Sequence, residues 1–177
     1  MQAPEIAVSR WFNTMQPLSL QALLGRPVLI HAFQMLCPGC VAHSLPQIER
    51  VHRLFKDSDL QVIGLHTVFE HHDAMTPVSL EAFIHEYRLT FPIGVDQPGE
   101  KPPIPITMER YGMRGTPTTI LIGRDGALLH HAFGREDDLA VGALIASALV
   151  TAVAIAPHAP GATASCQEEG CRAPPRT

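Results

Sequence analysis

Apolar runs of strand length alternate with amphipathic runs of helix length along most of this chain of 177 residues. Nearly continuous apolar runs predict buried strands over residues 28–33, 60–67, 118–122 and 127–133, with a short extended segment over 91–96. Helical spacing predicts helices over residues 41–55, 80–89 and 139–156, with a single helical turn over 107–111.

The order of these elements indicates an α/β fold. Strands that alternate with helices form parallel pairs joined by right-handed crossovers. Asp125-Gly126 lies between the last two strand runs and predicts an antiparallel hairpin there. We therefore expect a three-layer α/β sandwich with a mixed central sheet. Pro46 should kink the first helix, and Ser79 and either Asp137 or Asp138 should serve as N-caps of later helices.

The chain divides into three parts by composition. We predict an N-terminal lead-in over residues 1–17, one folded domain over 18–156 and a flexible tail over 157–177 that is rich in Pro, Ala and Gly. The tail contains Cys166 and Cys171, and three roles stay open for this pair: relay of disulfides, metal binding, or none.

One run raises the question of a membrane. Residues 139–156 contain no charged residue and approach the length of a membrane span. About half of the run is Ala, Gly, Ser or Thr, and no Lys or Arg follows it closely. We interpret it as a buried terminal helix and predict no membrane partner.

Composition narrows the class of protein further. The chain is 46% hydrophobic and 17% charged, which is typical of a globular domain. Its net charge of -4 argues against a nucleic-acid partner. The N-terminus shows no apolar signal region, and four cysteines are too few for a disulfide scaffold, so we expect a reducing, cytoplasmic location.

The stretch Leu36-Cys37-Pro38-Gly39-Cys40 lies where the first predicted strand ends and a helix begins. Unsatisfied backbone N–H groups and the helix dipole stabilise a thiolate at such a position. Pro38 suits the first helical turn because its missing N–H would have no partner there. The spacing alone leaves three interpretations open: a redox pair, half of a zinc site, or two inert core cysteines.

A second motif, residues 111–119 (YGMRGTPTT), comes after the Cys37–Cys40 motif, and the two stand in the order found in a known family. With the Cys37–Cys40 motif it resembles the thioredoxin-like superfamily, particularly its TlpA-like and redoxin members, over roughly residues 18–153. The resemblance implies a thiol–disulfide oxidoreductase. Cys37 would attack a substrate disulfide, and Cys40 would resolve the mixed disulfide. Thr116 and a cis Pro117 would face the dithiol and bind substrate.

The resemblance also implies the partners. We expect a protein or small-molecule disulfide as substrate and an unidentified dithiol as electron donor. We expect no cofactor beyond the redox-active Cys37–Cys40 disulfide, and no metal.

The sequence departs from this family at several positions. Leu36 stands where thioredoxins have Trp, and Pro38-Gly39 replaces Gly-Pro. His31 occupies the position of a buried Asp in thioredoxin, and His43 that of a Glu found in some TlpA-like proteins. We hypothesise that His31 or His43 accepts the proton of Cys40, because neutral imidazole does so near pH 7. The alternative is a hydrogen-bonded core residue for His31 and a solvated one for His43.

Two rival functions remain. Peroxiredoxins resemble this fold but place Thr or Ser three residues before the reactive cysteine, where this chain has Gln34. A metal-binding module would use Cys37, Cys40 and His43 as zinc ligands, with His31 or His66 nearby. The cluster Glu70-His71-His72-Asp73 resembles a ligand set but equally resembles an ordinary polar loop.

Overall fold

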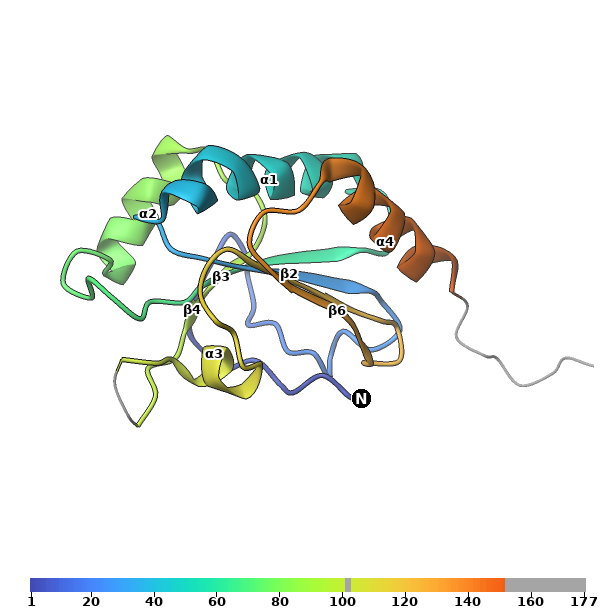
Figure 1. Ribbon diagram of the computed structural model, residues 1–177, viewed down its shortest axis with the longest axis horizontal. Helices are drawn as coiled ribbons and strands as arrows, with labels where there is room; N and C mark the ends of the chain where they lie inside the picture. The colour runs from blue at the N-terminus through green and yellow to red at the C-terminus, as the bar shows by residue number, and fades with distance from the viewer. Residues whose placement is uncertain (101–102, 152–177) are drawn as a thin grey trace, which may run out of the picture.

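The structure, a computed structural model, describes residues 1–100 and 103–151. A single mixed sheet organises this part of the chain. Its six strands are β1 (Val8–Phe12), β2 (Val28–Phe33), β3 (Gln61–His66), β4 (Ile93–Asp96), β5 (Thr118–Ile122) and β6 (Leu128–Phe133). They lie in the order β1-β4-β3-β2-β5-β6, so β2 is flanked by β3 and β5 (Figure 1).

The directions of the strands make the sheet mixed. β2, β3 and β4 run parallel to one another, whereas β1, β5 and β6 are each antiparallel to a neighbour. The carboxyl ends of β2, β3 and β4 therefore meet at one edge of the sheet, together with the start of β5. The turn between β5 and β6 contains Gly126, whose φ of 79° lies in the region that favours glycine.

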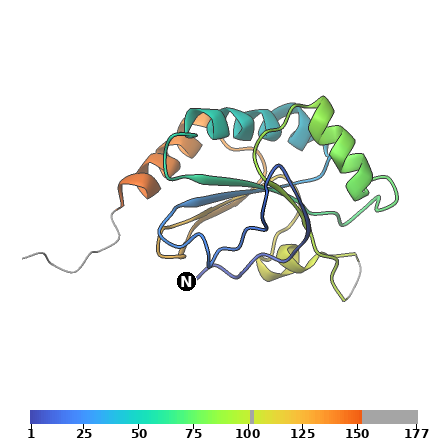
Figure 2. The same ribbon diagram turned by 180° about the vertical axis from the view of Figure 1, so that it is seen from behind.

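Helices α1 (Leu45–Leu54), α2 (Pro77–Glu86) and α4 (Asp138–Val150) cover one face of the sheet, and the short helix α3 (Ile106–Arg110) lies on the other (Figures 1 and 2). Side chains on the helix-covered face form a core with Leu29, Phe33 and Cys40 among its members. The opposite face packs against α3 and the N-terminal segment, with Ile6, Leu20 and Leu23 buried. The layers confirm the predicted α/β sandwich.

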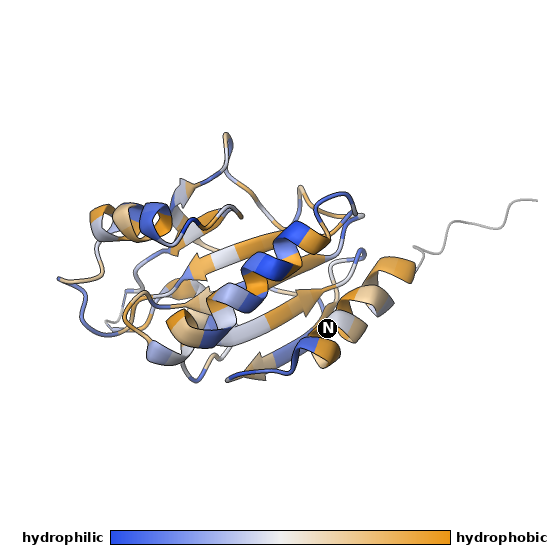
Figure 3. Cartoon of the chain, turned by 90° about the horizontal axis from the view of Figure 1, so that it is seen from above, coloured by the Kyte–Doolittle hydropathy of each residue, from blue (hydrophilic) through white to orange (hydrophobic). Residues whose placement is uncertain are grey.

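Hydropathy explains this layering. Every residue of β2 and β5 is buried, as expected for central strands with both faces covered. Seen from above, apolar stretches of the central strands lie beneath α1, which carries strongly hydrophilic residues along its length (Figure 3). Only one side of α4 is buried, and the buried residues are Val141, Ile145 and Ala148. This spacing is helical, so the uncharged run packs one face on the sheet rather than lying buried all round.

The structure differs from the sequence predictions at three places. β1, which the hydrophobic pattern did not predict, pairs with β4 at the edge of the sheet. The N-cap of α2 is Thr76, whose hydroxyl accepts the N–H of Ser79; α2 begins earlier because Pro77 suits a first helical position. α4 begins at Asp138, and Asp137 is its N-cap, as one of the two predicted alternatives. Predictions for residues 152–177, including Cys166 and Cys171, fall outside the described residues.

The predicted kink at Pro46 takes the form of a turn of π-helix. Residues Cys40–Ser44 form this turn immediately before α1, and the N–H of Leu45 donates to the carbonyl of Cys40. Pro46 has no N–H to donate one turn back, and in a regular α-helix its ring would crowd the carbonyl of the residue four positions earlier. The wider turn relieves this conflict. None of the helices in the described ranges is long and apolar enough to cross a membrane.

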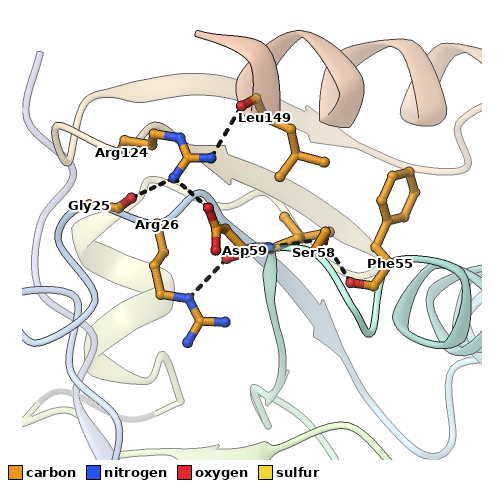
Figure 4. A network of polar contacts seen from close by, with 8 residues as sticks. Gly25, Arg26, Phe55, Ser58, Asp59, Arg124 and Leu149 are labelled. Atoms are coloured by element: carbon orange, nitrogen blue, oxygen red, sulfur yellow. Dashed lines mark hydrogen bonds and ion pairs between the residues drawn. The ribbon is translucent and has the colours of Figure 1, made fainter. Parts of the chain in front are cut away.

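At the opposite edge of the sheet from the Cys37–Cys40 motif, Arg124 joins several segments (Figure 4). Its guanidinium donates to the carbonyl of Gly25 at 2.7 Å, to the carboxylate of Asp59 at 3.1 Å and to the carbonyl of Leu149 at 3.1 Å. These contacts connect the β5–β6 turn to the segments before β2 and β3 and to the end of α4. Arg26 adds a bond from its Nε to the carbonyl of Asp59 at 2.9 Å.

Candidate active site

Cys37 and Cys40 lie where β2 leads into the π-turn. The N–H of Cys37 donates to the carbonyl of Gln34 at 3.1 Å, which closes a tight turn after the strand. Cys37 is partly exposed and Cys40 is fully buried, and both are free thiols. The N–H of Cys40 donates to the Sγ of Cys37 at 3.3 Å. A backbone donor aimed at this sulfur stabilises it when it carries negative charge.

Burial makes the Cys40 thiol chemically different from the Cys37 thiol. Burial first, and then the hydrogen bond with Cys37, raise the pKa of the Cys40 thiol to about 12. Hydrogen bonds from the backbone of Gln34 and with Thr116 act in the opposite direction but are smaller causes. Cys40 is therefore protonated at neutral pH, while the accessible sulfur is that of Cys37.

The loop before β5 faces the dithiol. The carbonyl oxygen of Thr116 lies 3.6 Å from the Sγ of Cys37, which donates to it. The peptide bond between Thr116 and Pro117 is cis. A Cβ built on Gly39 would lie 3.8 Å from the Cδ of Pro117, so the proline ring sits against the turn between the two cysteines. Thr116 and Pro117 thus lie beside the cysteines, where the resemblance predicted them.

His31 and His66 are buried on the helix-covered face of the sheet. His31 lies between Leu29 and Phe33 on the same face of β2, and these two residues belong to the same core as Cys40. Its Nδ1 lies 3.5 Å from the hydroxyl of Thr119, and its Nε2 has no hydrogen-bond partner among the described residues. Burial lowers the pKa of His31 to about 4, so its imidazole is neutral at pH 7.

His66 holds the turn that carries the cysteines. Its Nε2 accepts the N–H of Met35 at 3.4 Å, and its Nδ1 has no hydrogen-bond partner in the part of the chain that the structure describes. Burial also lowers the pKa of His66 to about 4. Its ring lies 5.3 Å from that of Phe33, between centroids.

His43 lies on the exposed side of the π-turn. It borders a small cavity of about 150 Å³ together with Arg135 and Glu136. Glu136 bonds the Nε2 of His130 at 2.7 Å. The structure thus separates the two candidate proton acceptors, because His31 is buried in the core with Cys40 and His43 faces solvent.

The metal hypothesis finds no support in residues 1–100 and 103–151. No group of three or more His, Cys, Asp or Glu side chains in these ranges is arranged to hold a metal ion. His31 and His66 are engaged in the core, and the cluster at Glu70–Asp73 forms no such group either. The described residues therefore do not assemble the Cys37, Cys40 and His43 ligand set.

Gln34 is a site residue whose role the sequence analysis missed. Its side chain is 1% exposed. Its Oε1 accepts the N–H of Phe69 at 3.4 Å, and its Nε2 donates to the Oε1 of Glu70 at 3.3 Å. It therefore connects the turn before Cys37 to the loop after β3. A polar residue that directly follows a nearly continuous apolar run was the available signal, since a buried amide needs partners.

Comparison with known proteins assigns the chain to a family. The model of the AhpC/TSA family matches residues 1–131, so the chain belongs to the AhpC/TSA family. Protein DipZ of Mycobacterium tuberculosis is 29% identical over 138 residues, which cover 76% of this chain and 19% of DipZ. The thiol-disulfide oxidoreductase ResA of Halalkalibacterium halodurans is 26% identical over 126 residues, which cover 70% of this chain and 64% of ResA. The chain thus spans about a fifth of DipZ and just under two thirds of ResA.

Solved structures agree with this assignment. The thioredoxin-like superfamily protein SPOA0173 is 52% identical, with a TM-score of 0.83, over 86% of this chain and 98% of that protein. A thiol-disulfide isomerase from Corynebacterium glutamicum is 46% identical, with a TM-score of 0.80, over 85% of this chain and 98% of that one. The predicted resemblance is confirmed: the chain is a thioredoxin-like redoxin.

Proposed function

We propose that this protein is a thiol–disulfide oxidoreductase in which Cys37 is the nucleophile and Cys40 the resolving cysteine. One observation carries the proposal. An accessible Cys37 sulfur receives the N–H of a fully buried Cys40, and the Thr116 carbonyl faces it at 3.6 Å. Such a pair can accept a substrate on one sulfur and keep the other protonated until it is needed.

The reaction consists of two exchanges. The Cys37 thiolate attacks one sulfur of the substrate disulfide, forms a mixed disulfide and expels the other substrate sulfur as a thiolate, which takes a proton. Cys40 then loses its proton and attacks the Cys37 sulfur, which breaks the mixed disulfide and releases the second substrate thiol. The protein loses two electrons as Cys37–Cys40 becomes a disulfide, and the substrate gains them.

Protein disulfides are the substrates that this geometry suits best. The backbone of Thr116 lies next to the attacking sulfur, where an extended polypeptide can pair with it. The names of ResA and of the Corynebacterium glutamicum thiol-disulfide isomerase refer to thiol–disulfide chemistry, which supports the same class of reaction. An external dithiol would return the protein to its reduced form, and the Cys37–Cys40 disulfide would be the redox group of this reaction.

His31 is the better candidate to accept the proton of Cys40. It is neutral at pH 7 because burial lowers its pKa, and its Nε2 is free of other partners. Since the pKa of the Cys40 thiol is higher, the proton would move as the new S–S bond forms, not before. His43 faces solvent, outside the core that encloses Cys40. The cytoplasmic location expected from the sequence stays a prediction, which fractionation of cells would check.

Serine variants of the two cysteines test the assignment. We expect Cys37→Ser to lose disulfide reduction by at least about a hundredfold, since it removes the nucleophile. Cys40→Ser should still form mixed disulfides but should not release them. Thiol release from a model disulfide and intact-protein mass spectrometry measure the two steps.

Matched variants and a second substrate complete the experiment. The variant Cys40→Ala at the same buried position, together with circular dichroism of each variant, controls for loss of folding. The assignment is wrong if Cys37→Ser keeps full activity, or if Cys40→Ser turns over normally. Rapid consumption of hydrogen peroxide with a dithiol donor, without reduction of disulfides, would favour a peroxidase instead.

A further inference from the structure

Two charged side chains flank the dithiol on opposite sides. Cys37 follows β2, Glu70 follows β3, and Arg114 precedes β5. Because β3 and β5 are the two neighbours of β2 in the sheet, Glu70 and Arg114 lie on either side of Cys37 at the same edge. Both side chains are exposed. We call this pair the charged rim.

Arg114 is held next to the loop that faces Cys37. Its guanidinium carbon lies 5.3 Å from the centroid of the Phe133 ring, a cation–π distance. The same ring closely covers Gly115, where a Cβ would lie 3.0 Å from a ring carbon. Thr116, whose carbonyl contacts the Cys37 sulfur, comes next in the chain. The charge of Arg114 is therefore anchored on the loop that contacts the sulfur.

Glu70 is held from the other side by Gln34. The side-chain amide of Gln34 donates to the Oε1 of Glu70 at 3.3 Å, and its main-chain carbonyl accepts the N–H of Cys37 at 3.1 Å. One residue thus fixes both the carboxylate and the turn that presents the nucleophile.

Neither member of the charged rim has an ionic partner among the described residues. Other charges near this edge largely compensate one another. Arg50 pairs with Asp138 at 2.9 Å, and the carboxylate of Glu136 bonds the Nε2 of His130 at 2.7 Å, an ion pair only when that imidazole is protonated. Arg135 also lies close enough to Asp138 to lower the pKa of that carboxyl slightly, after Gln47 and Arg50. Arg114 and Glu70 are thus left to act on what binds at Cys37.

We propose that the charged rim selects extended polypeptides in which the disulfide-bonded cysteine has an acidic residue on one side and a basic residue on the other. The acidic residue would face Arg114 and the basic residue Glu70. Neighbouring strands are about 4.8 Å apart, so the two flanks are about 10 Å apart across β2. An extended chain rises about 3.3 Å per residue, which places the two charges within one or two residues of the cysteine. This inference rests on the proposed function and names its substrate class.

Two isomeric peptides test it directly. Each is blocked at both ends, contains one cysteine joined by a disulfide to 2-mercaptoethanol, and carries one Asp and one Lys in opposite order around that cysteine. Pre-reduced protein is mixed with each peptide, and its loss of free thiols is followed by rapid alkylation and mass. We expect one order to react about threefold to tenfold faster at low ionic strength, because composition and net charge are identical and only the match to the rim differs.

Variants assign the preference to the rim. Arg114→Gln and Glu70→Gln should each reduce the logarithm of the rate ratio between the two peptides by at least about half. Glu70→Gln keeps a side-chain oxygen that can accept the hydrogen bond from Gln34. Arg114→Lys retains the charge and should keep most of the preference. Arg88→Gln is the control, because Arg88 is an exposed arginine after α2 at the other edge of the sheet. Salt at about 0.5 M should weaken the preference by screening.

Failure of this inference is distinguishable from failure of the proposed function. Equal rates for the two peptides, or a preference that survives both Gln variants, would overturn the role of the charged rim. In either case reduction of the neutral bis(2-hydroxyethyl) disulfide by Cys37 would continue. If no disulfide is reduced by the wild-type dithiol, the proposed function itself is wrong.

Discussion

At the residue scale, position relative to the core gives two chemically identical thiols different properties. Cys37 and Cys40 are separated by two residues, yet one is accessible and the other is enclosed with Phe33 and Leu45. Burial raises the pKa of the enclosed thiol to about 12. Burial also changes the pKa of two neighbouring histidines: it lowers that of His31 and of His66, so both are neutral at pH 7.

The role of His31 gives a prediction at this scale. We expect His31→Leu to form mixed disulfides at the normal rate but to resolve them about tenfold to a hundredfold more slowly at pH 7, because the proton of Cys40 loses its acceptor. Quenched-flow alkylation over a range of pH separates the two steps. His43→Ala is the matched comparison and should leave resolution unchanged. Normal resolution in His31→Leu, with a defect in His43→Ala, would assign the proton to the exposed histidine instead.

At the element scale, local sequence signals and long-range contacts contribute unequally. The apolar runs of β2, β3 and β5 and the hairpin glycine predicted those elements correctly, because both faces of a central strand are buried and Gly126 permits a positive φ. β1 was missed because it is an edge strand that depends on its pairing with β4, which local periodicity does not show. The π-turn was foreseen only as a kink, since Pro46 excludes a regular helix without specifying its replacement.

Arg124 shows how distant elements are joined and gives a stability prediction. We expect Arg124→Ala to lower the free energy of unfolding by about 2–3 kcal/mol, because it removes three hydrogen bonds from a side chain that is 18% exposed. Arg26→Ala removes one bond in the same network and should cost less than about 1 kcal/mol. Urea denaturation measures both. Equal losses in the two variants would show that the contacts of Arg124 do not act as described.

At the scale of the whole molecule, the buried histidines make global stability depend on pH. The pKa of His31 and of His66 is about 4 in the folded state, against an ordinary value of 6.5. Between these values the unfolded chain binds more protons than the folded protein, so stability falls as pH falls from about 6.5 towards 4. Asp96, whose pKa burial raises, acts in the opposite direction at the acidic end.

This linkage predicts that the free energy of unfolding drops by about 2 kcal/mol between pH 7 and pH 5.5, from the two histidines together. Urea denaturation at both pH values measures the drop. His31→Leu should lose about half of it, whereas His85→Leu, at an exposed position, should show the wild-type drop. The same drop in all three proteins would contradict the assignment to buried imidazoles.

The sequence by itself determined the alternation of strands and helices, the family and the two cysteines, because these depend on local periodicity and short motifs. It also placed Thr116 and Pro117 in a motif, and His31 and His43 at positions where the family has carboxyl groups. Only the tertiary structure separated His31 from His43, gave Gln34 its contacts with Phe69 and Glu70, and set Glu70 and Arg114 on either side of Cys37. The reason is physical: burial and contacts between residues tens of positions apart depend on strand order in the sheet, which local periodicity does not encode.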